Sequence, residues 1–222
     1  MTARLVQRGG AATKKAAPRT RQPARTREQI LVAATEEFAA SGLGGARVDK
    51  IARRAGANKR MLYHYFGNKE DLFLAVMERT YEHIRQRESA LRLEELAPVE
   101  AMRKFVEFTF NYFSENPHFV NLLNSENLHR ARHIRRSGRV EEINSPVLAA
   151  LGRILERGRA EGVFRAKVDP TQFYITVAGV CYFYFSNIHT LSTIFGRDFQ
   201  SKRQLAEREK HVTEVVLGYL RA

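Results

Sequence analysis

The sequence predicts an all-α protein in which a small N-terminal three-helix head is followed by a larger helical body. Apolar residues recur at intervals of three and four along most of the chain, which is the period of helices with one buried face. Helix-start signals precede these stretches, as at Asn58, Asn68 and Asp169-Pro170. Only residues 163–168 alternate like a β-strand, and a single strand cannot form a sheet.

Composition and charge narrow the class of protein. The chain has 222 residues, of which 44% are hydrophobic, and 37 Lys and Arg against 24 Asp and Glu give a net charge of +13. Residues 1–27 hold eight of these basic residues and no acidic one, so we expect a polyanionic partner near the N-terminus. Cys181 is the single cysteine, which fits a reducing compartment, and we find neither a secretion signal nor a membrane span. We therefore expect a cytoplasmic protein.

The chain is expected to divide into three parts. Residues 1–24 lack apolar periodicity and should form a flexible basic arm. Residues 25–67 should form the head, and residues 68–222 the body. Apolar periodicity predicts helices from 26 to 42, 48 to 55, 58 to 66, 68 to 87, 98 to 115, 118 to 132, 146 to 158 or 162, 170 through the apolar run 173–185, and 202 to 220.

Local signals set several of these boundaries. Thr26 and Gln29 have the spacing of a capping box, which predicts that the first helix begins at Thr26. Gly42 supplies a left-handed stop for that helix. Ser145-Pro146 places a capping residue before a proline, which predicts that a body helix begins at Pro146.

Two short helices of the head have the pattern of a helix-turn-helix unit. They are joined through Gly56, and the second begins with the polar and basic residues Asn58-Lys59-Arg60. Such a helix can enter the major groove of DNA when an apolar back face holds the pair at a fixed angle. Lys59 and Arg60 are residue types that neutralise phosphates or donate to guanine.

A longer run in the head is more specific. It is Val48-x-x-Ile51-Ala52-x-x-Ala55-Gly56-Ala57-x-Lys59-x-x-Leu62-Tyr63-His64-Tyr65-Phe66-x-Asn68-Lys69-Glu70-x-Leu72. In order and spacing, this run closely resembles the DNA-binding domain of the TetR family of bacterial transcriptional regulators, over residues 26–75. Segments of the body, 116–129 and 161–170, resemble one subgroup of that family less specifically.

The resemblance implies roles for individual residues of the head. It implies that Asn58, Lys59, Arg60 and Met61 face base edges and nearby phosphates, and that Tyr63, His64 and Lys69 reach the DNA backbone. Leu62 and Phe66 are expected to pack the head instead. Arg47 departs from the family pattern, in which a Thr commonly caps the second helix. Arg47 can contact phosphate but cannot cap, so that helix end is either uncapped or covered by the arm.

The body is expected to dimerise and to bind a small molecule. The run 173–185 is apolar on every side, so we expect the helices beginning at Asp169 and near Lys202 to pair with their copies across a two-fold axis. Burial in a monomer core is the alternative for this run. Aromatic residues and polar residues set into apolar faces suggest a ligand pocket. The candidate ligand-binding residues are Phe105, Tyr112, Phe119, Asn121, Glu126, His129 and Tyr182.

Glu126 has two interpretations. It lies on the apolar side of its helix, so it either contacts a ligand or pairs with one of the arginines at 130, 132, 135, 136 and 139. A metal site formed with His129 and His133 is disfavoured, because ligands spread over two helical turns cannot all reach one ion.

These patterns predict a DNA-binding transcriptional regulator without a cofactor, a metal or a catalytic motif. Its expected partners are a double-stranded, roughly palindromic DNA operator, a second copy of the chain and a small-molecule effector that releases the repressor from DNA. The alternative class is a small helical ligand-binding enzyme or carrier, which leaves Lys59, Arg60, Tyr63 and the basic arm unexplained.

Overall fold

A computed structural model describes residues 23–222, and the all-α prediction is confirmed in this range. Residues 1–22, most of the predicted arm, lie outside the described residues. The elements are α1 (Pro23–Gly45), α2 (Val48–Arg54), α3 (Lys59–Phe66), α4 (Lys69–Ser89), η1 (Leu93–Glu95), α5 (Pro98–Glu115), α6 (Pro117–Leu128), η2 (Ile134–Arg136), α7 (Val140–Ala160), α8 (Pro170–Ser186), α9 (Ile188–Phe195) and α10 (Lys202–Leu220). Within this range, the predicted strand-like segment forms only an isolated bridge between Phe164 and Arg221.

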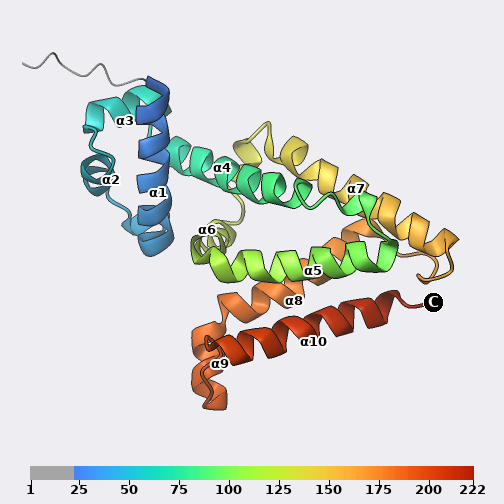
Figure 1. Cartoon of the computed structure of the whole chain (residues 1–222). Coiled ribbons are helices and arrows are strands. Elements are labelled where there is room, and N and C mark those ends of the chain that lie inside the picture. Colours follow the sequence, from blue (N-terminus) through green and yellow to red (C-terminus); the bar gives the residue numbers. More distant parts are fainter. Residues whose placement is uncertain (1–22) are drawn as a thin grey trace, which may run out of the picture.

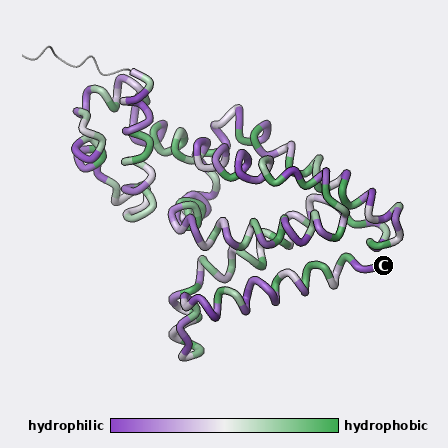
Figure 2. The backbone as a smooth tube through the Cα atoms, in the orientation of Figure 1, coloured by the Kyte–Doolittle hydropathy of each residue, from purple (hydrophilic) through white to green (hydrophobic). Residues whose placement is uncertain are grey.

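Helices α1 to α3 form the head, and α4 runs from it into the body, where α7 lies beside it (Figure 1). In the body, α5 packs against both α8 and α10. Hydrophobic and hydrophilic residues alternate along the body helices (Figure 2), as expected for helices with one buried face. Among the helices of residues 23–222, none could span a lipid bilayer.

The polar residues predicted to start α3 and α4 do so. The Asn58 side chain accepts a hydrogen bond from the Met61 backbone N–H at 2.9 Å, and Asn68 accepts one from the Asp71 N–H at the same distance. These bonds satisfy amides that the first turn of a helix leaves free. The start of each of these helices is therefore set by its own sequence.

Two predicted helix starts are wrong. Helix α1 begins at Pro23, so Thr26 lies inside the helix and is buried. Helix α7 begins at Val140 and contains Pro146. Pro146 has no N–H for the Glu142 carbonyl, and the Ser145 hydroxyl donates to that carbonyl at 3.2 Å instead. Ser145 thus repairs the helix ladder rather than beginning a helix.

Other boundaries also differ from the sequence prediction. Helix α1 is interrupted at Gly42, where φ is 63°, as the stop signal predicted. Helix α6 ends at Leu128, short of the predicted Arg132, because Arg130 and Ala131 turn the chain with positive φ. The short helix α9 had no counterpart in the prediction.

Helix α4 contributes to two separate hydrophobic cores. Leu72, Phe73 and Met77, from its first half, are buried in the core of the head. Leu122 of α6 belongs to the same core, so the head packs onto the body through α6 as well as α4. Ile84, from the second half of α4, is buried in the core of the body. The boundary placed at residue 67 stays a prediction, and this apolar packing continues past it.

Helices α8 and α10 expose apolar side chains on one face. Ile175 and Phe183 of α8 are 55% and 56% exposed, while Val215 and Tyr219 of α10 are 49% and 47% exposed. The run 173–185 is therefore covered on one face only within a single copy of the chain, contrary to the alternative of complete burial in a monomer core. An exposed apolar face of this size is typical of a surface that a partner covers.

A charge on this face should prevent dimer formation. We expect Val215→Glu to sediment as a monomer, because two carboxylates would meet near the two-fold axis in an apolar interface. Val32→Glu, at a 42% exposed valine of α1, is the matched control and should remain a dimer. Sedimentation velocity measures both variants, and a Val215→Glu protein that sediments as a normal dimer would place the interface elsewhere.

Candidate DNA-binding and ligand sites

Helix α3 presents a polar and basic surface to solvent. Arg60, Tyr63 and His64 are exposed, while Leu62 and Phe66 are buried against the rest of the head. The packing role expected of Leu62 and Phe66 is therefore confirmed. The exposed groups can donate to phosphates and base edges without any rearrangement of the core.

Lys59, at the start of α3, forms an ion pair in the structure. Its Nζ lies 2.5 Å from Oδ1 of Asp49 on α2, and both side chains are about half exposed. An exposed ion pair of this kind contributes at most about 1 kcal/mol to stability. Lys59 can therefore exchange Asp49 for a DNA phosphate at little cost.

Three of the other predicted DNA-binding residues have structural roles. The Oδ1 atom of Asn58 is the N-terminal cap of α3, and Met61, which donates to it, is half-buried. Lys69 donates from Nζ to the Gly44 carbonyl at 3.3 Å, which joins the start of α4 to the end of α1. Asn58 is nevertheless exposed at the start of α3, whereas Met61 and Lys69 are half-buried.

Glu37 explains how α2 is held without a capping residue. Arg47 precedes α2 and its side chain makes no capping bond, but its backbone N–H donates to Oε1 of Glu37 at 3.2 Å. Lys50 lies 2.9 Å from Oε2 of the same carboxylate. Burial acts to raise the pKa of Glu37, and the bonds from Lys50 and Arg47 outweigh it and lower that pKa. A carboxylate of α1 thus holds the beginning of the helix-turn-helix unit, and the expected cover by the arm falls mostly outside the described residues.

A cavity of about 490 Å³ lies between α4, α5, α6 and α8. Phe119 and Tyr182, two of the predicted ligand-binding residues, line it. Tyr81 meets Phe119 edge to face with ring centroids 5.8 Å apart, and Phe113 meets Tyr182 at 6.1 Å. The walls are therefore largely aromatic, as in many small-molecule sites.

The other predicted ligand-binding residues do not line this cavity. Phe105 is buried in the body core, and the Tyr112 hydroxyl is 2.8 Å from Nδ1 of His83. Asn121 is exposed on α6. His129 is exposed at the end of α6, with its Nδ1 2.7 Å from the Ser125 carbonyl oxygen.

Glu126 pairs with a histidine rather than with an arginine or the cavity. It is 2% exposed, and its Oε2 lies 2.7 Å from Nδ1 of His133. Its Oε1 accepts hydrogen bonds from the backbone N–H groups of His133 and Ile134 at 2.8 and 2.9 Å. The arginine pairing expected for Glu126 is therefore wrong. The turn after α6 bends back toward the helix, so the backbone meets the carboxylate before any arginine side chain does.

This turn also connects the body to the head. The His133 ring meets Phe73 of α4 edge to face, with centroids 5.1 Å apart. Arg136 approaches Asp71 to 2.5 Å, and Arg139 approaches Glu82 to the same distance. These two of the arginines expected near Glu126 are therefore bound to α4 instead. In the described part of the chain, no group of three or more His, Cys, Asp or Glu residues is placed to hold a metal ion.

The sequence interpretation missed the charged residues of the cavity, Arg85 and Glu88. Both lie on α4, with Nη1 of Arg85 2.6 Å from Oε2 of Glu88. Tyr81, Arg85 and Glu88 follow one another at helical spacing beside the buried Ile84. The test that singled out Glu126, a polar residue set into an apolar face, would also have found this pair.

Both halves of the chain match models of one family. Residues 30–76 match the model described as "Bacterial regulatory proteins, tetR family", and residues 98–216 match "Tetracyclin repressor-like, C-terminal domain". The chain is 38% identical over 209 residues to the HTH-type transcriptional repressor NicS of Pseudomonas putida, covering 94% of this chain and 99% of that protein. The chain therefore belongs to the TetR family of bacterial transcriptional regulators.

Solved structures show the same fold. A putative transcriptional regulator, SCO4942 of Streptomyces coelicolor, superposes with a TM-score of 0.67 at 22% identity, over 88% of this chain and 98% of that one. A transcriptional regulator FadR of Bacillus subtilis, in complex with stearoyl-CoA, has a TM-score of 0.63 at 20% identity, over 87% and 99%. The family models and the relative from Pseudomonas putida confirm the family resemblance of the head.

Removing the Glu126 carboxylate should destabilise the protein strongly. Glu126→Ala leaves the His133 and Ile134 N–H groups and the His133 ring without their buried partner, which should cost about 3 kcal/mol of unfolding free energy. Glu115→Ala, which breaks an exposed pair with Arg87, is the control and should cost less than about 1 kcal/mol. Urea unfolding compares them, and equal midpoints would show that the Glu126 bonds do not hold this turn.

Proposed function

We propose that the chain is a homodimeric repressor that binds a roughly palindromic operator through two copies of α3 and leaves it when a small molecule enters the cavity. The observation that carries this proposal is the position of α4, which lines the cavity and is also part of the core of the head. The protein would act by binding alone, in the cytoplasm, where the operator DNA is accessible.

The surface of α3 supports specific DNA binding. Arg60, Tyr63 and His64 are exposed together on one short helix whose opposite side is buried. With Lys59, they form the DNA-binding surface that we propose, and Arg47, Asn58, Met61 and Lys69 border it. The alternative, a ligand-binding enzyme or carrier, gives this exposed basic surface no role.

Release requires a difference in ligand affinity between two arrangements of the heads. A ligand shifts the equilibrium only if it binds the DNA-incompetent arrangement more tightly. Phe119 and Tyr182, together with Tyr81 and Arg85 of α4, are the cavity residues that we propose to contact it. Because Tyr81 and Arg85 lie on the same helix as Phe73, a ligand that moves them also moves a core residue of the head.

The test is to isolate the operator and then remove the basic pair of α3. Selection of bound fragments from genomic DNA should yield a site with two-fold symmetry. We expect Lys59→Ala combined with Arg60→Ala to weaken binding to this site by at least about 100-fold in a gel-shift titration, because each half-site is deprived of two basic side chains. Arg92→Ala combined with Arg159→Ala makes the same charge change on exposed residues outside α3 and outside the helices of the expected dimer interface, and it should bind almost normally. Equal affinities of the two double variants would contradict the proposal.

The arm should add affinity but little sequence preference. Deleting residues 2–22 removes six basic residues and no acidic one, and it leaves α1 intact. For each DNA phosphate that the shortened chain no longer neutralises, the slope of log affinity against log salt should become shallower by about 0.9. Binding titrations at several salt concentrations measure this slope, and an unchanged slope would show that the arm does not contact DNA.

A further inference from the structure

We propose that the effector is a small aromatic carboxylate whose negative group binds Arg85 in place of Glu88. This inference rests on the proposed function, since it names the ligand of the same cavity. Two observations support it: the Arg85 guanidinium is buried with donors that make no hydrogen bond, and the cavity is lined by aromatic side chains.

Arg85 is a largely buried cation with unused hydrogen-bond donors. Its side chain is 11% exposed, and that of Glu88 is 7% exposed. Nη2 donates to the Tyr174 hydroxyl at 3.3 Å, whereas Nε and Nη1 are buried and make no hydrogen bond within the part of the chain that the structure describes. The contact between Nη1 and Glu88 is a close ion pair that lacks hydrogen-bond alignment. A guanidinium has five N–H donors, and leaving buried donors unsatisfied is costly.

An anion satisfies this group better than a neutral ligand or a cation does. A carboxylate can accept from two guanidinium nitrogens at once, which is the geometry that Nε and a terminal nitrogen offer. Of the residues that line the cavity, only Arg85 and Glu88 carry charge. Burial raises the pKa of Glu88 to about 7, although the charge of Arg85 acts to lower it. Burial thus favours the neutral form of Glu88, which compensates the Arg85 charge less well than an ionised carboxylate does.

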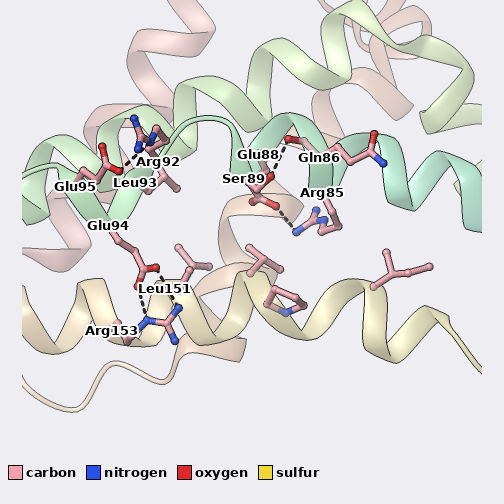
Figure 3. Close-up of a pocket in the computed structure, with 14 residues that line it drawn as sticks. Arg85, Gln86, Glu88, Ser89, Arg92, Leu93, Glu94, Glu95, Leu151 and Arg153 are labelled. Atoms are coloured by element: carbon pink, nitrogen blue, oxygen red, sulfur yellow. Dashed lines mark hydrogen bonds and ion pairs between the residues drawn. The ribbon is translucent and has the colours of Figure 1, made fainter.

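The Glu88 carboxyl group has space into which it can move when a ligand binds Arg85. It lines a second cavity of about 520 Å³, between the end of α4, η1 and α7, as well as the aromatic one (Figure 3). The other ion pairs drawn there join Glu94 with Arg153 and Arg92 with Glu95. The rest of the lining consists of Gln86, Ser89 and apolar side chains. The carboxyl group of Glu88 can thus turn away from Arg85 without entering the protein core.

The aromatic walls select the rest of the ligand. Tyr81, Phe119 and Tyr182 supply flat apolar surfaces, and the Tyr174 ring lies beneath the guanidinium with its centroid 5.6 Å away. A planar ring next to a carboxylate would fill the space between these side chains and bring its charge to Arg85. An aliphatic carboxylate of similar size would pair with Arg85 but would lack the ring contacts with the aromatic side chains.

The experiment measures binding of matched probes to the full-length protein by calorimetry. The probes are benzoate and 2-naphthoate, their uncharged amides, the cation benzylamine and the aliphatic hexanoate. We expect at least one aromatic carboxylate to bind roughly 10- to 100-fold more tightly than its amide, as a charged hydrogen-bonded pair predicts. Hexanoate and benzylamine should bind more weakly than that carboxylate.

Variants of the ion pair give opposite expectations for an anion and a cation. Arg85→Gln should abolish the preference for the carboxylate over its amide, whereas Glu88→Gln should keep it and tighten carboxylate binding, because a competing carboxylate is removed. Arg87→Gln, on the exposed side of α4, is the matched control and should bind like the unaltered chain. If Arg85→Gln does not fold, the Arg85→Gln, Glu88→Gln double variant, which buries no lone charge, replaces it and should lack the preference.

Several results would overturn the proposal. The proposal is wrong if neither benzoate nor 2-naphthoate binds, or if their amides bind as tightly as they do. It is also wrong if Arg85→Gln keeps the preference for the carboxylate over its amide, or if benzylamine binds and this binding is lost in Glu88→Gln. Failure of the proposed function would give a different result, because the chain would then bind no operator DNA. That outcome does not depend on which probes bind in the calorimeter.

Discussion

The structure depends on one helix being shared by two hydrophobic cores. Phe73 and Met77 fix the first half of α4 in the head, and Ile84 fixes its second half in the body. A packed core resists small displacements, so α4 cannot change its position in one core without straining the other. Tyr81 and Arg85 lie on the same helix and face the aromatic cavity. A change at the α4 part of the cavity wall is therefore a change in the helix that carries the head.

The segment after α6 is a second connection between body and head, and it works through polar contacts. Glu126 closes the turn internally through His133, so that the turn behaves as one packed unit against Phe73. Arg136 and Arg139 then bind the acidic side of α4. Each of these exposed ion pairs is weak alone, but both close on a turn that is already ordered, which lowers the entropy lost in forming them. The body thus holds α4 along two sides, by α7 and by this turn.

The sequence predicts the parts of this fold whose causes are local. Asn58 and Asn68 act on the backbone three residues away, so their capping roles can be read without knowing the tertiary structure. The prediction that α1 begins at Thr26 failed because helical residues precede it, so Thr26 has no helix end to cap. The prediction that a helix begins at Pro146 failed because a hydrogen bond from the Ser145 hydroxyl lets α7 continue through the proline. The exposed residues of α3 followed from spacing, whereas the neighbours of Glu126 depended on how a later turn folds back.

Arg85 shows why the ligand site is harder to predict than the DNA-binding surface. A recognition surface lies on one short helix, so residue order places it. The cavity joins α4 to α5, α6 and α8, and no sequence spacing brings Tyr81, Tyr174 and Tyr182 together. The buried pair of Arg85 and Glu88 is a more informative feature than the aromatic walls, because desolvating two charges without full hydrogen bonding opposes folding. A ligand that completes the bonds of Arg85 would recover part of that cost, with the Glu88 carboxyl group turned toward the second cavity.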